Sequence, residues 1–90
     1  MKTRNKDINN DAVFMLMAEG ITKDIVEINY TLIREGSLSK EDFAKLQRVI
    51  QDLTDLADNA RLYHHERLCD VVNMQLQCTM IYTLAKGLGS

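Results

Sequence analysis

The feature of this sequence that most limits its fold is the absence of helix-breaking residues over a long stretch. The chain of 90 residues contains no proline, and from Lys40 to Lys86 it contains no glycine either. These two residue types are the strongest local signals for the end of a regular element. Apolar residues in the first part of the stretch recur at alternating steps of three and four, the spacing of one helix face. They are Phe43, Leu46, Ile50, Leu53, Ala57 and Ala60.

This pattern blurs in the segment ADNARLYHHERL, residues 57–68. Asp58 and Asn59 are poor residues for a helix interior and good residues for a helix cap. A single helix of about 45 residues could run through the segment, or a break between residues 58 and 65 could divide it into helices of about 18 and 20 residues. Because very long helices are unusual in small domains, we favour the break.

Signals for helix ends also lie before residue 40. Gly36 stands where a left-handed residue would close a helix, and Ser39 stands where a cap would open the next one. We therefore expect a helix from about residue 23 to Gly36 and a tight hairpin into the helix that begins near Lys40. Thr22 would cap the first of these two helices.

A separate short helix is expected before this hairpin. Residues 11–20, DAVFMLMAEG, are rich in apolar side chains and end in glycine, the residue preferred just beyond a helix C-terminus. The fold class that follows is all-α, with a short N-terminal helix followed by an antiparallel bundle of two or three longer helices. At this length the chain forms one domain over residues 1–90, with flexible tails at residues 1–9 and 87–90.

The stretch VNMQLQCTM, residues 72–80, alternates apolar and polar residues without a slip. Such alternation is typical of a half-buried strand, but no convincing second strand is present to pair with it. Gln, Met and Leu are also better helix formers than strand formers. We therefore predict a helix here, and one that is apolar over so much of its circumference that it is covered on more than one side.

No residue from 71 to 85 carries a charge. A helix at the centre of the fold or a self-association face would explain this, and we favour self-association. One face would hold Leu68, Val72, Leu76 and Met80. The adjoining face, which we assign to contact with a second copy, holds Val71, Met74, Cys78 and Ile81. A homodimer is favoured over a monomer because a domain of this size has only a modest core, to which association adds burial.

Composition excludes several classes of protein. The net charge is −2, so the chain as a whole has no electrostatic attraction to nucleic acid. No apolar run approaches the ~20 residues needed to cross a bilayer, and no apolar segment follows the basic N-terminus as in a secretory signal. With these features and two cysteines, we expect a cytoplasmic protein.

Candidate catalytic and metal-ligating residues are few. His65 and Cys69 are four residues apart on a helix and could reach one metal ion, but a structural zinc site needs four ligands and this is not a zinc-finger spacing. We therefore expect no metal, no cofactor and no enzymatic activity. Residues 64–66 are expected to form an exposed polar turn, and Cys69 to be a small buried apolar residue.

Residues 32–46, LIREGSLSKEDFAKL, could alternatively form a helix-turn-helix, which would make the protein a DNA-binding protein. The first turn of its second helix would enter the major groove, where phosphates would repel Glu41 and Asp42. The helix layout is similar to that of small enterobacterial two-component connector proteins of the biofilm and acid-resistance type. This resemblance rests on layout and on no motif; the corresponding alternative function is a dimeric DNA-binding transcriptional regulator.

The function that we expect is that of a small, non-catalytic interaction or regulatory protein. It would self-associate through its C-terminal helix and bind a protein partner through an exposed acidic face. The residues assigned to that face are Glu27, Glu41, Asp52 and Asp55.

Overall fold

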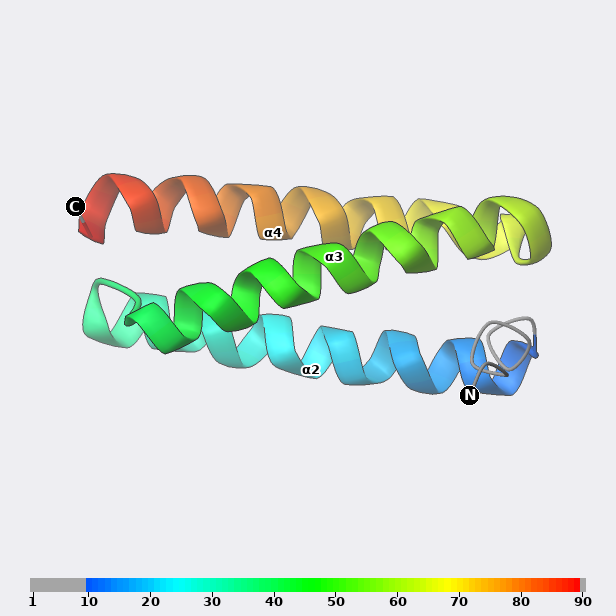
Figure 1. The fold of residues 1–90 in the computed structure, drawn as a ribbon, viewed down its shortest axis with the longest axis horizontal. Helices are drawn as coiled ribbons and strands as arrows, with labels where there is room; N and C mark the ends of the chain where they lie inside the picture. The colour runs from blue at the N-terminus through cyan, green and yellow to red at the C-terminus, as the bar shows by residue number, and fades with distance from the viewer. Residues whose placement is uncertain (1–9, 90) are drawn as a thin grey trace.

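The computed structural model of the protein describes residues 10–89 and is an all-α bundle of three long helices (Figure 1). Helix α2 (Asp11–Glu35) is followed by α3 (Lys40–Tyr63), which returns alongside it in the opposite direction. A short 3-10 turn, η1 (His65–Arg67), leads into α4 (Leu68–Gly89), which runs in the same direction as α2. The predicted tail at residues 1–9 lies outside the described residues, and α4 extends into the segment predicted as a C-terminal tail.

Helix α2 corrects the prediction of a separate short N-terminal helix. It is one helix of 25 residues, and Gly20 lies inside it with no positive φ angle. Thr22, the predicted cap, instead donates a hydrogen bond from Oγ1 to the carbonyl oxygen of Ala18 at 2.8 Å, which is a helix-interior contact. The reason is that one buried apolar stripe continues past the glycine: Phe14, Ile21, Ile25, Ile28 and Leu32. Burial of this stripe outweighs the ~1 kcal/mol that an interior glycine costs.

The helix ends around the first turn are confirmed. Gly36 has a φ of 80°, and its N–H donates to the carbonyl oxygen of Leu32 at 2.8 Å. Oγ of Ser39 accepts a hydrogen bond from the N–H of Asp42 at 3.1 Å, which caps α3. The left-handed glycine and the serine cap together produce the tight hairpin between α2 and α3.

The predicted break between residues 58 and 65 is also confirmed. Helix α3 ends at Tyr63, and His64 leaves the helical conformation with a φ of −136°. Residues 72–80 lie inside α4, so their alternation belongs to a helix, and none of residues 10–89 forms a strand.

The core runs along the bundle between the three helices. Helix α3 packs against both of the others, whereas α2 and α4 contact one another least. Helix α3 contributes the most buried side chains: Leu46, Val49, Leu53, Leu56, Ala57 and Ala60. The looser contact between α2 and α4 is the part of the fold that positions the candidate site.

Candidate functional site: the outer face of α4 and the α2–α4 groove

The residues predicted for self-association mostly face the protein's own core. Val71 is 1% exposed and Cys78 is 0% exposed, and Ile81 is also buried, while Met74 is half-buried. This face of α4 packs on the other helices within one copy. The structure contains one copy and so leaves self-association untested, but it shows that these four side chains are not the exposed surface of α4.

The exposed apolar side chains of α4 lie on the adjoining face. Leu76 is 58% exposed and Met80 is 63% exposed, and both belong to a row of residues at steps of four. This row, the α4 ridge, is Val72, Leu76, Met80 and Leu84. Residues four apart form a continuous ridge on the surface of a helix. The outward face of α4 is therefore apolar along three turns.

A groove lies beside this ridge, between α4 and α2. It consists of two hollows, of about 460 Å³ and about 310 Å³, that share Gln77. The smaller hollow has no charged residue in its lining, which consists of Ile25, Val26, Asn29, Gln77, Met80, Ile81 and Leu84. Val26, which is exposed, therefore lies across this hollow from the C-terminal half of the α4 ridge.

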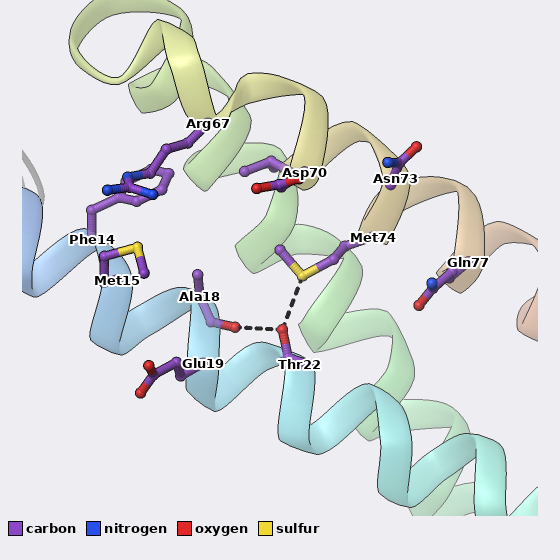
Figure 2. Close-up of a pocket in the computed structure, with 11 residues that line it drawn as sticks. Phe14, Met15, Ala18, Glu19, Thr22, Arg67, Asp70, Asn73, Met74 and Gln77 are labelled. Carbon is purple, nitrogen blue, oxygen red and sulfur yellow. Dashed lines mark hydrogen bonds between the residues drawn. The ribbon is translucent and has the colours of Figure 1, made fainter.

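The larger hollow, unlike the smaller one, has charged residues in its lining (Figure 2). Glu19, Arg67 and Asp70 line it together with Phe14 and Met74. The hydroxyl of Thr22, already bonded to Ala18, lies 3.2 Å from the sulfur of Met74 and so connects α2 to α4 across the groove.

At one end of the groove lies an interaction that sequence reasoning missed. Arg67 donates from Nε and Nη2 to the two carboxylate oxygens of Asp11 at 3.1 and 3.2 Å. These hydrogen bonds hold the pKa of the Asp11 carboxyl below its ordinary value, and the carboxylate raises the pKa of Arg67. The contact joins the first turn of α2 to η1, immediately before α4 begins. The two residues are 56 positions apart, and no local signal links them.

His64 belongs to the same end of the molecule and corrects the prediction of a fully exposed polar turn. Its imidazole is 4% exposed, and its ring centroid lies 4.4 Å from that of Phe14. Nδ1 of His64 is 3.5 Å from Oδ1 of Asp11. His65 is exposed as expected, but Cys69 is exposed where burial was predicted. Within residues 10–89, no three His, Cys, Asp or Glu residues are grouped so that they could hold a metal ion.

No protein-family model matches this chain, and no curated protein or solved structure matches it either. Its function must therefore be inferred from its own residues. Among the helices that the structure describes, none combines the length and apolar character needed to cross a membrane.

The predicted acidic face lies on α2 and α3. Glu27, Glu41, Asp52 and Asp55 are all exposed. Nζ of Lys45 lies 3.2 Å from Oε1 of Glu27, so this carboxylate is partly neutralised. Helix α3 begins beside the C-terminal end of α2 and runs obliquely across to the start of α4 (Figure 1). Its first turn carries Glu41 and Asp42. The structure adds no basic cluster to that turn.

Proposed function

We propose that this chain is a small, non-catalytic, cytoplasmic interaction protein that forms a homodimer through α4. The observation that carries the proposal is the α4 ridge, an exposed apolar row on a helix without a charge from residue 71 to 85. Isolated exposed apolar residues are ordinary, but a contiguous exposed apolar patch is typical of an interaction site. This surface differs from the one expected at first, because the row lies beside Val71 and Cys78 and not on them.

Helix α2 extends the same surface on the far side of the groove. Val26, Tyr30 and Ile33 are exposed and follow helical spacing, so they lie on one side of α2. Together with the α4 ridge they form what we term the apolar surface: Val26, Tyr30, Ile33, Val72, Leu76, Met80 and Leu84.

The extent of the apolar surface fits a dimer. A stable interface buries about 800 Å² of each partner, of which about 56–65% is apolar. Seven large apolar side chains, six of them more than half exposed and Val72 38% exposed, can supply on the order of 500 Å². The chain exposes 6042 Å² in all, so such an interface would cover roughly an eighth of its surface.

The occupant that suits this surface best is a second copy of the same chain. In a two-fold contact a surface meets itself, so any charge near its centre would meet a like charge. The outer face of α4 has none from residue 71 to 85. Its neutral polar residues, such as Asn73 and Gln77, are exposed and can hydrogen-bond across the contact without the cost of burying a charge.

The molar mass in solution tests this proposal. Light scattering after size exclusion is expected to give twice the mass of the 10.3 kDa chain. Met80→Glu should convert the dimer to a folded monomer, because it places a carboxylate in the contact without touching the core. The matched control is Leu62→Glu, which changes a side chain that is 75% exposed on α3 and should leave the dimer intact. A monomeric wild type at high protein concentration would refute the proposal.

A protein partner would bind on the charged surface that the dimer leaves open. We assign this role to Glu41, Asp52 and Asp55 on α3, which are exposed and lie outside the α2–α4 groove. The double variant Asp52→Lys and Asp55→Lys should lose partners that the wild type retains in affinity purification from the host, while its molar mass stays that of the dimer. If both proteins retain the same partners, the assignment of these residues is wrong.

A further inference from the structure

We infer that, in the dimer proposed above, the two copies of α4 cross antiparallel at about 50° around a two-fold axis at the level of Cys78. Leu76 of each copy then packs against Met80 of the other. The inference rests on the proposed function and adds the direction and register of the pairing.

The crossing angle follows from the spacing of the α4 ridge. A coiled coil needs apolar residues at alternating steps of three and four. On the outer face of α4 that seam would pass through Asn73, Leu76, Met80 and Thr83, so two of its four positions are polar. The exposed apolar residues instead follow steps of four. When such ridges of two helices interdigitate, the axes cross at about 50° and contact is concentrated at the middle of the row.

The antiparallel direction follows from symmetry and charge. The α4 ridge is symmetric about residue 78, since Leu76 and Met80 are equally far from it, as are Val72 and Leu84. Asp70 and Lys86 border the uncharged stretch at equal distances from the same point. A parallel pair would place Asp70 at the level of Asp70 in the other copy, and Lys86 at the level of the other Lys86, so that like charges face one another. An antiparallel pair brings opposite charges, and opposite ends of the helix dipoles, to the same level.

The groove suits this arrangement. Because the axes cross, the N-terminal half of each α4 passes over the C-terminal half of the other copy's α2–α4 groove. The second copy's Val72 then lies against Leu84, beside the uncharged hollow that Leu84 lines with Val26. The apolar end of the groove is thus covered, and the polar end near Arg67 stays open to solvent.

Cross-linking of single cysteines distinguishes the two directions. Cys69 is exposed near the start of α4, nine positions before residue 78. At 1.5 Å per residue, the two Cys69 residues lie about 27 Å apart along an antiparallel pair but side by side in a parallel pair. Cysteine at position 76 is offset by only about 6 Å in the antiparallel pair. Cys78 is fully buried, and burial raises the pKa of its thiol to about 11, so we expect it not to react with the reagent.

A short bismaleimide is expected to leave the wild-type dimer unlinked and to link most of the Leu76→Cys variant in a Cys69→Ser background. Leu62→Cys in that background is the control and should stay unlinked. Met80→Cys tests the same contact if Leu76→Cys weakens the dimer. Efficient linking of wild-type Cys69 would overturn the antiparallel direction. Failure of both positions 76 and 80 to link, in variants that scatter as dimers, would overturn the register. A wild-type monomer would instead refute the proposed function itself.

Discussion

At the scale of single residues, the contact between Asp11 and Arg67 joins the start of α2 to the connection between α3 and α4. Arg67 is the last residue of η1, and Asp11 is the first residue of α2. Exposed ion pairs usually add little to stability, but a bidentate pair with defined geometry adds more than a single contact. Asp11 is also 3.5 Å from the buried imidazole of His64, so one carboxylate orders two side chains of the α3–α4 connection.

Replacement of the Asp11 carboxylate should make the melting temperature less dependent on pH in the acidic range. The pKa of Asp11 is held below its ordinary value of 3.8 by the hydrogen bond from Arg67, so its contribution to stability is complete above pH 3.8 and is lost as the pH falls through the lowered pKa. Asp11→Asn should therefore melt slightly below the wild type at pH 7, with a difference that shrinks as the pH falls below 3.8. Asp58→Asn, which removes an ion pair within α3, is the control. A difference that stays constant down to pH 2 would contradict this assignment.

The two cysteines should differ sharply in reactivity. Cys69 is exposed, whereas Cys78 is buried and its pKa is raised to about 11 by burial. A thiol reagent such as Ellman's should titrate one thiol rapidly at pH 8 in the folded protein and the second only after unfolding in guanidinium. Rapid reaction of both thiols under native conditions would show that the α4 face toward the core opens readily.

At the scale of elements, two glycines show that tertiary burial decides whether α2 continues at Gly20 and that local geometry decides where it ends, at Gly36. Gly20 lies within the helix because the buried stripe on both sides of it, from Phe14 to Leu32, packs on the other helices. Gly36 ends the helix because its positive φ suits glycine and few other residues.

Alanine at these two positions should have opposite effects. A Cβ atom at Gly20 meets nothing within 4 Å, so Gly20→Ala should raise the free energy of unfolding by about 1 kcal/mol through helix propensity. Gly36→Ala should lower it by roughly 1 kcal/mol, because a Cβ atom is strained at a φ of 80°. Urea denaturation of both variants measures the two changes. A destabilised Gly20→Ala would indicate that α2 bends or opens at this residue.

At the scale of the whole molecule, the side of the bundle between α2 and α4 is apolar and contains a groove that is exposed to solvent. The side between α2 and α4 has the loosest packing, and it carries the apolar surface. A second copy on this side would increase the buried apolar area of a chain whose own core is limited by its size.

The thermal stability of a dimer depends on its concentration, which gives an independent check. Because association stabilises the folded state by mass action, the melting temperature of the wild type should rise as the protein concentration rises from micromolar to hundreds of micromolar. Met80→Glu should abolish this dependence, and Leu62→Glu should retain it. A wild-type melting temperature that is independent of concentration over this range would argue against a dimer in equilibrium with a less stable monomer.

The sequence by itself determined the helical class, the hairpin at Gly36 and Ser39, a break between residues 58 and 65, and the uncharged stretch of α4. These depend on periodicity and caps, which act over a few residues and can be read locally. Sequence reasoning also placed the candidate site on α4, but on its inward face.

Only the tertiary structure decided which side of α4 is buried. Val71 and Cys78 on one face and Leu76 and Met80 on the next are similarly apolar, so their hydrophobicity alone does not rank them. The choice depends on where α2 and α3 lie against the helix, as do the continuity of α2 past Gly20 and the pairing of Asp11 with Arg67. Each of these joins residues far apart in the chain, and their free energy exists only once the bundle has formed.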